Sequence, residues 1–255
     1  MLKSGLVSVS FRALEPEEII RITAEAGLAG IEWGGDVHVP PGDPENARRI
    51  GALTRAAGLE VSGYGTYYRL GRHVGDLTEE FAALLETAKA LCAPVMRIWA
   101  GTKASADVSE DERAALVAEA KTVARMAENA GVPAAFECHR NPLTDDYRSA
   151  VRLMSEIGSP FLRMYWQPNE SRSPAYDREA LAALLPYIEN VHVFNWPDTE
   201  TRRPLEEAGT LWQGYFSALA ADGKDRWCLL EFMPDDDPAS LKREAAALTA
   251  FMKQA

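Results

Sequence analysis

Cysteine and histidine are scarce in this chain of 255 residues, which contains three of the first and four of the second. Cys92, Cys138 and Cys228 are far apart and odd in number, so we expect reduced thiols and not a disulfide framework. No apolar run approaches the roughly 20 residues that span a bilayer, and the first residues lack the apolar stretch of a signal peptide. The sequence therefore predicts a cytoplasmic protein without a membrane partner.

Positive charge is also scarce, because 27 Lys and Arg residues oppose 38 Asp and Glu residues and give a formal net charge of -11. An acidic protein repels a phosphodiester backbone, so we expect no nucleic-acid partner. The hydrophobic fraction of 47% is typical of a globular protein with a large core. These features favour a protein that binds a small molecule, either alone or as a homo-oligomer.

Short β-rich runs alternate with longer helical stretches eight times along the chain. The runs cover residues 5–11, 30–35, 60–68, 95–101, 133–139, 162–168, 189–196 and 226–233. One helical stretch opens with Ser109 and Glu112 in a capping-box pattern and closes at Gly131. Glycine-containing turns such as EAGLAGIEW lead from a helix into the next run, as in a βαβ unit.

Eight βα units predict a (β/α)8 TIM barrel, an α/β fold that here forms a single domain over residues 1–255. The chain length lies within the usual range of one such barrel. A doubly wound sheet fits less well, because it usually has about five or six strands. We therefore expect the active site on the loops at the carboxyl ends of the strands.

Three residues stand out at that end, because each is ionisable or metal-ligating within an otherwise apolar run: Glu137, His192 and Glu231. Two buried carboxylates are costly without a cation, and Arg97 is the only arginine well placed at the mouth. A divalent metal held by two carboxylates, one imidazole and an amide oxygen of Gln167 resolves this charge. Taken singly, these residues also fit a salt-bridged glutamate or a buried core histidine, and Gln167 also fits a hydrogen bond to substrate or water.

Five motifs carry a family resemblance over nearly the whole chain: IEWGGDVHV, FECHRNPLTDD, MYWQPN, NVHVFNW and LLEF. With them the chain resembles the xylose isomerase-like TIM barrel superfamily, and within it the sugar phosphate isomerase/epimerase group. The resemblance implies one divalent metal bound by Glu137, a residue of the sixth strand, His192 and Glu231. It also implies that Glu137 and Glu231 exchange protons with the substrate.

The sixth and seventh strands depart from the family pattern. Where the family has Asp on the sixth strand, this chain has Tyr165, Trp166 and then Gln167. The His-x-Lys-Asp pattern of the seventh strand appears here as HVFN, residues 192–195. Two alternatives therefore stand for the sixth strand: Gln167 binds the metal, or it turns away and leaves a degenerate site.

The function that the resemblance implies is a metal-dependent isomerase or epimerase of a small sugar, polyol or sugar acid. Mn, Mg, Co or Zn polarises a carbonyl and stabilises an ene-diolate, while Glu137 and Glu231 carry the proton. The expected substrate contacts are His38, Arg97, Trp99, His139, Arg140 and Asn195. A lyase or dehydratase of the same superfamily and a non-catalytic sugar-binding barrel remain as alternatives. An abasic-site endonuclease is disfavoured, because it needs more histidines and less negative charge.

Overall fold

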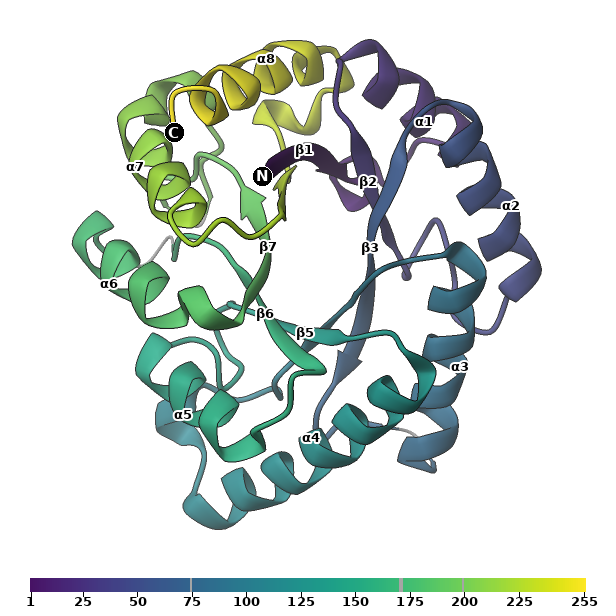
Figure 1. Ribbon diagram of the computed structural model, residues 1–255, viewed down its shortest axis with the longest axis vertical. Helices are drawn as coiled ribbons and strands as arrows, with labels where there is room; N and C mark the ends of the chain where they lie inside the picture. Colours follow the sequence, from purple (N-terminus) through teal and green to yellow (C-terminus); the bar gives the residue numbers. More distant parts are fainter. Residues whose placement is uncertain (74, 170–171, 199) are drawn as a thin grey trace.

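The computed structural model describes residues 1–73, 75–169, 172–198 and 200–255. Over these residues eight parallel strands close into one barrel in chain order, and an α-helix follows each strand (Figure 1). The strands are β1 (Leu2–Val7), β2 (Gly30–Gly34), β3 (Glu60–Arg69), β4 (Met96–Trp99), β5 (Ala134–Glu137), β6 (Leu162–Trp166), β7 (Ile188–Val193) and β8 (Arg226–Leu230). The helices are α1 (Pro16–Glu25), α2 (Pro44–Ala56), α3 (Leu77–Leu91), α4 (Glu110–Ala130), α5 (Tyr147–Ile157), α6 (Pro174–Leu184), α7 (Gly209–Ala220) and α8 (Leu241–Met252). The predicted (β/α)8 barrel is confirmed.

The first strand lies earlier in the chain than the sequence predicted. The expected run was 5–11, whereas β1 ends at Val7 and residues Ser8–Phe11 form a short 3-10 helix. Ser8 Oγ accepts a hydrogen bond from the backbone N–H of Gly34 at 2.8 Å. Because this hydroxyl takes the place of a backbone acceptor, the ladder between β1 and β2 ends and the chain turns out of the sheet.

Helix α4 has the ends that the sequence predicted. Ser109 and Glu112 form a reciprocal capping box, and Gly131 ends the helix in the left-handed conformation with φ of 69°. The two motifs satisfy backbone groups that otherwise have no partner at a helix end.

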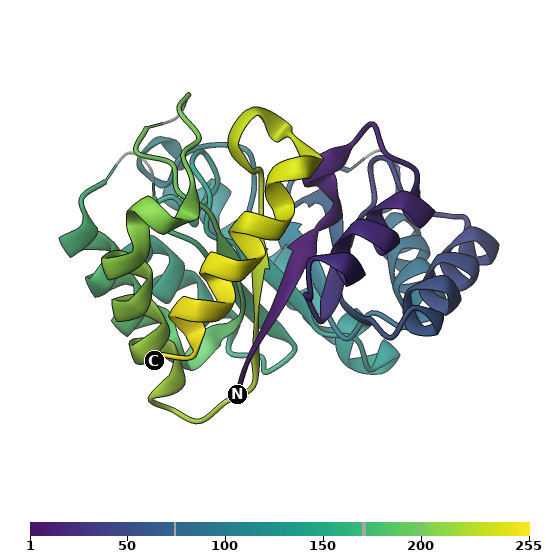
Figure 2. The same ribbon diagram turned by 90° about the horizontal axis from the view of Figure 1, so that it is seen from above.

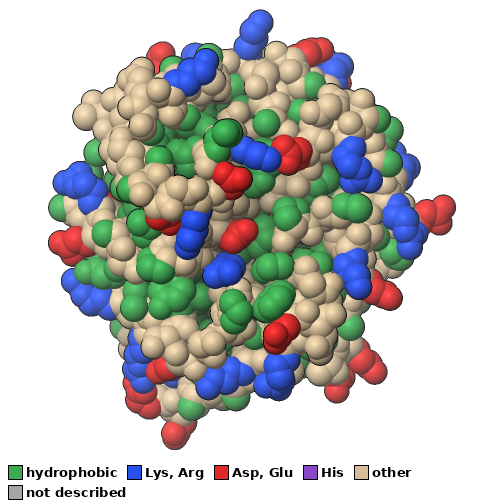
Figure 3. Space-filling view, in the orientation of Figure 1, with side chains coloured by type: hydrophobic (Ala, Val, Ile, Leu, Met, Phe, Trp, Pro, Cys, Tyr) green, Lys and Arg blue, Asp and Glu red, His purple; other side chains and the backbone are tan. Residues whose placement is uncertain are grey.

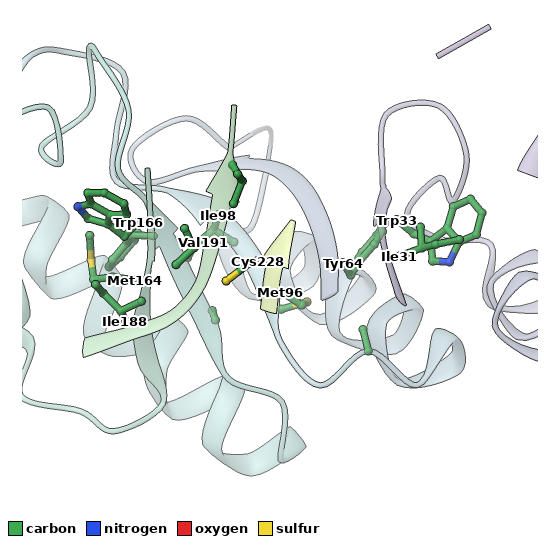
Figure 4. Packing of buried hydrophobic residues seen from close by; sticks show 14 of the residues in the cluster. Ile31, Trp33, Tyr64, Met96, Ile98, Met164, Trp166, Ile188, Val191 and Cys228 are labelled. Carbon is green, nitrogen blue, oxygen red and sulfur yellow. The ribbon is translucent and has the colours of Figure 1, made fainter. Parts of the chain in front are cut away.

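Side chains on the outer face of the barrel form the main core with the helices. Figure 4 shows Trp166 beside Met164 and Ile188 in this layer, with Trp33 on another side of the barrel. The Trp33 indole donates to Thr54 Oγ1 of α2 at 3.2 Å. Trp166 packs edge-on against Tyr215 of α7 with ring centroids 5.1 Å apart. These tryptophans therefore attach helices to the barrel and do not line its mouth.

The inside of the barrel is filled below the mouth. Val95, Ala135, Trp227 and Leu229 lie in one buried cluster. Gly30 leaves room for this packing, because a Cβ there would lie 2.7 Å from the Trp227 ring. The apolar plug confines polar chemistry to the last inward-facing layer, at the carboxyl ends of the strands.

Both chain termini lie at the end of the barrel where the strands begin. Figure 2 shows both chain termini at the lower edge, the end where the strands begin. In the space-filling view of Figure 3, acidic and basic side chains are mixed, and neither sign forms a continuous patch on that face. Among the described residues, no helix has the length and apolar character needed to cross a bilayer.

Candidate metal centre at the mouth of the barrel

The structure brings together the three residues that the sequence singled out. Glu137 is the last residue of β5, His192 lies near the end of β7, and Glu231 follows β8 directly. One ligand atom of each residue lies within 4.8 Å of the others, and all three side chains are buried. This convergence follows from the parallel barrel, because the carboxyl ends of its strands meet at one face.

His192 presents its two ring nitrogens to different partners. Its Nδ1 lies 3.3 Å from Glu231 Oε2, 3.5 Å from Glu137 Oε1 and 3.0 Å from Gln167 Oε1. Gln167 directly follows β6, so its amide oxygen faces the same point as the two carboxylates. Gln167 thus points toward the candidate ligands and contacts His192, and its binding of a metal stays a prediction.

Tyr165 lies deeper in the barrel than this group. Its hydroxyl accepts a hydrogen bond from Asn190 Nδ2 at 2.8 Å, and its ring meets the His192 ring edge-on at 5.3 Å. Tyr165 therefore forms part of the floor beneath His192. Its phenol pKa is raised well above the usual value by burial and by the Glu32 carboxylate.

Glu32 of β2 also belongs to this layer, and the sequence reasoning did not select it as a site residue. It is 0% exposed; its Oε1 accepts from Arg97 Nε at 3.0 Å, and its Oε2 lies 3.6 Å from His192 Nε2. Arg97 also donates to Glu137. The signal was available, because Glu32 is a lone acidic residue within an apolar strand, just as Glu137 is.

Two glycines of β3 leave space for these charged side chains. A Cβ at Gly65 would lie 2.7 Å from Glu32 Oε1 and 2.8 Å from Arg97 Nη2. A Cβ at Gly63 would lie 2.5 Å from the Tyr165 hydroxyl oxygen. Any larger residue at either position must displace the buried layer, so glycine is required here by close approach.

The backbone after β8 holds Glu231 in place. Glu231 N–H donates to Val193 O at 3.1 Å, and Phe232 N–H donates to Ser10 Oγ at 2.9 Å. Phe232 has φ of 50°, in the left-handed region that bulky residues rarely adopt. Such a conformation costs about 1–3 kcal/mol, and here the surrounding hydrogen bonds maintain it.

The charges of this layer do not balance without a cation. Among the described residues, the carboxylates of Glu32, Glu137 and Glu231 face one guanidinium, that of Arg97, which leaves an excess of two negative charges while His192 is neutral. Burial acts to raise the pKa of Glu137, but Arg97 and His192 lower it overall. Burial acts to lower the pKa of His192, but the three carboxylates raise it well above its usual range. The donor set and the charge both fit one divalent ion.

Metal binding should release a proton from His192. Below its raised pKa the ring is protonated, and a metal requires the neutral form, so metal affinity should fall as the pH falls. Calorimetric titration with Mn²⁺ near neutral pH, in two buffers of different ionisation enthalpy, should show release of about one proton per ion. Equal heats in the two buffers would contradict this assignment.

The predicted contacts Trp99 and His139 lie together at the rim of the mouth. Their ring centroids are 4.5 Å apart, and the Tyr67 ring of β3 stacks with Trp99 at 6.4 Å. His139 Nδ1 lies 2.8 Å from the backbone oxygen of Arg140, an exposed residue. Trp99, His139 and Arg140 are at least partly exposed at the rim, and their contact with substrate stays a prediction.

The remaining predicted contacts are engaged within the protein. Arg97 is buried between Glu32 and Glu137. His38 is buried with its Nδ1 2.9 Å from Ser8 Oγ, and Asn195 Nδ2 donates to Pro204 O at 2.8 Å. Substrate binding by these three stays a prediction as well, but their first role is to hold the mouth and its loops together.

The fold and this centre define the class of protein: a TIM barrel with a candidate metal centre at the carboxyl ends of its strands. The sequence model of the xylose isomerase-like TIM barrel family matches residues 20–254, so the chain belongs to that family. This confirms the superfamily that the motifs indicated.

Proteins similar to this chain in sequence or structure include enzymes. A 3-dehydroshikimate dehydratase of Bacillus anthracis is 25% identical over 211 residues, which are 76% of this chain and 72% of that protein. The structure of the probable 3-DHS dehydratase AsbF from Bacillus anthracis superposes with a TM-score of 0.82 at 23% identity, over 98% of this chain and 99% of the other. An L-ribulose 3-epimerase superposes with a TM-score of 0.76 at 17% identity, over 99% and 95%. At these identities the superpositions show a shared fold.

Proposed function

We propose that this protein is a divalent-metal-dependent enzyme that removes a proton beside the carbonyl group of a small polyhydroxylated substrate. The observation that carries the proposal is the convergence of Glu137, His192, Glu231 and Gln167 on one point at the barrel mouth. These four residues would hold the ion, and a bound divalent ion polarises a carbonyl oxygen and so acidifies the neighbouring C–H. The similarity to a dehydratase and to sugar epimerases supports the same type of chemistry.

Glu231 is the better candidate for the residue that takes the proton. Glu137 already accepts a hydrogen bond from Arg97, which stabilises its carboxylate and lowers its basicity. Among the described residues, the one ion-pair contact of Glu231 is with His192. Glu231 therefore keeps lone pairs for the substrate, while Arg97 holds Glu137 as a permanent anion.

Because Arg97 pairs with Glu137 and not with Glu231, the two glutamates are not equivalent bases. This difference supports dehydration as the outcome of the reaction. In a dehydration, Glu231 can take the proton from carbon and give it to the departing hydroxyl, which leaves as water, so one available carboxylate serves both steps. Epimerisation or isomerisation, the second candidate, is supported by the facing positions of Glu137 and Glu231 across His192. Incubation with 3-dehydroshikimate and with L-ribulose distinguishes the two, since the first is dehydrated and the second is epimerised.

Replacing Gln167 with Asp should strengthen metal binding by about 10- to 100-fold, because it adds one negative charge next to the ion. The same substitution should lower the melting temperature of the metal-free protein, because it adds a carboxylate to a layer already in negative excess. Titration of the metal-free proteins with Mn²⁺ measures the first effect, and thermal unfolding measures the second.

The matched control is Gln213→Asp, which adds the same charge on α7, where Gln213 bonds Gln254. It should leave metal affinity unchanged. If Gln167→Asp also leaves metal affinity unchanged, Gln167 does not contact the ion, and the degenerate, non-catalytic site is favoured instead.

A further inference from the structure

The arginines at the rim of the mouth differ in whether they form an ion pair within the protein. Arg12 forms an ion pair with Asp36, and Arg202 forms one with Asp236. Arg69 is the last residue of β3. Within the described parts of the chain, the Arg69 guanidinium forms no ion pair and donates no hydrogen bond; its close contact is with an aromatic ring. Among the described residues, the charge of Arg69 is therefore not paired with a carboxylate.

Arg69 is held on the side of the barrel that faces the metal centre. Gly63 and Gly65 of β3 face the buried charged layer, the register with β4 then shifts, and Arg69 pairs with Trp99 of β4. The centre of the Arg69 guanidinium lies 3.4 Å from the centroid of the Trp99 ring. A guanidinium stacked in this way is fixed in orientation, while the N–H groups at its edge stay free to donate.

Arg69 and Trp99 present hydrogen-bond donors that lack acceptors among the described residues. A guanidinium can only donate hydrogen bonds, and so can the Trp99 indole, whose Nε1 is buried without a partner in the described residues. Burial and the neighbouring Arg72 act to lower the pKa of Arg69, as expected for a cation that has no paired anion. A ligand that supplies oxygen acceptors and negative charge removes both deficits.

We propose that Arg69 is the subsite for a carboxylate group of the substrate. The proposal rests on the proposed function, because the same molecule must also place its oxygen atoms at the metal centre. Arg69 lies over the Trp99 ring, and Trp99 lies 4.5 Å, ring to ring, from His139, two residues after Glu137, so one small molecule can meet both. A carboxylate fits better than a phosphate, because one guanidinium balances one negative charge and the glutamates of the mouth repel a dianion.

The test uses two metal-chelating probes that differ only in the carboxylate: 3,4-dihydroxybenzoate and catechol. Calorimetric titration of the Mn²⁺-loaded protein should show tighter binding of 3,4-dihydroxybenzoate. Arg69→Gln should weaken that binding by about 10- to 100-fold, as expected for loss of a charge-assisted hydrogen bond, and leave catechol binding unchanged. Arg69→Lys keeps the charge but loses the planar fork, so it should fall between the two.

Arg202→Gln is the matched control, because Arg202 also covers a tryptophan, Trp196, but is paired with Asp236. It should bind both probes as the unmodified protein does. Equal affinity for the two probes, or an unchanged carboxylate preference in Arg69→Gln, overturns the subsite. Tighter binding of (3,4-dihydroxyphenyl)phosphonate than of 3,4-dihydroxybenzoate overturns the carboxylate assignment.

A different binding result would contradict the proposed function while leaving the Arg69 subsite in place. If catechol does not bind the Mn²⁺-loaded protein, the metal centre does not chelate substrate oxygens. Loss of 3,4-dihydroxybenzoate binding in Arg69→Gln would then still support the subsite, and no binding of either probe would contradict both proposals.

Discussion

Replacing Glu231 with Gln is expected to slow the exchange of substrate protons with solvent by at least about 100-fold, the contribution of one acid–base group. Gln has nearly the same shape but cannot take up a proton, so the fold should persist. Glu231 follows β8 directly and contacts His192 at 3.3 Å, without the Arg97 pairing that restrains Glu137. Deuterium incorporation from D₂O into 3-dehydroshikimate or L-ribulose, with Mn²⁺-loaded protein, measures the effect.

The control for this loss is Glu60→Gln, since Glu60 opens β3 at the other end of the barrel and pairs with Lys3 at 2.8 Å. Exchange in this variant should match that of the unmodified protein. Unchanged exchange in Glu231→Gln would mean that another residue carries the proton. Glu137→Gln would then become the decisive variant, because Glu137 is the other carboxylate beside His192.

Replacing Arg97 with Met should destabilise the metal-free protein by about 3–5 kcal/mol, because it leaves buried carboxylates without their cation. Arg97 and Glu32 are almost fully buried, with side chains 3% and 0% exposed, so solvent cannot take over the role of the guanidinium. Chemical denaturation measures the change in the free energy of unfolding. Added Mn²⁺ should recover part of the loss, since the ion binds only the folded state and neutralises the same carboxylates.

Arg163→Met is the comparison that separates this effect from the loss of any inward-facing arginine. Arg163 lies near the start of β6, and its Nε is 3.9 Å from Glu189 Oε2, with both side chains partly exposed. Such a pair contributes about 1 kcal/mol or less. Similar losses of stability in Arg97→Met and Arg163→Met would contradict the assignment of Arg97 as the cation that holds the buried layer together.

The architecture and the central residues of the candidate site could be predicted from the sequence, because both depend on local pattern. Strand runs, glycine turns and the capping box of Ser109 repeat at regular intervals, and each βα unit adds one strand to the barrel. Once the strand order is known, the ends of β5, β7 and β8 must meet. Glu137, His192 and Glu231 were found for that reason.

Pairing between particular side chains could not be predicted, because it depends on distances across the barrel. Arg97 was expected to bind substrate, yet it lies between Glu32 and Glu137, which come from strands on either side of it. His38 was likewise expected at the substrate, but the turn after β1 brings Ser8 within 2.9 Å of its ring. The availability of Arg69 also appears only when the partners of the other rim arginines are known.

The position of β8 at the end of the chain determines when, during synthesis and folding, the metal centre can form. Glu137, the first of the four proposed ligands along the chain, ends β5, whereas Glu231, the last, follows β8, the strand that closes the ring by pairing with β1. A fragment that ends before β8 lacks Glu231, so, on the proposed function, a nascent chain would not complete its ligand set until the ring is closed. On that proposal, metal binding would report closure of the ring and would stabilise the strand that is synthesised last.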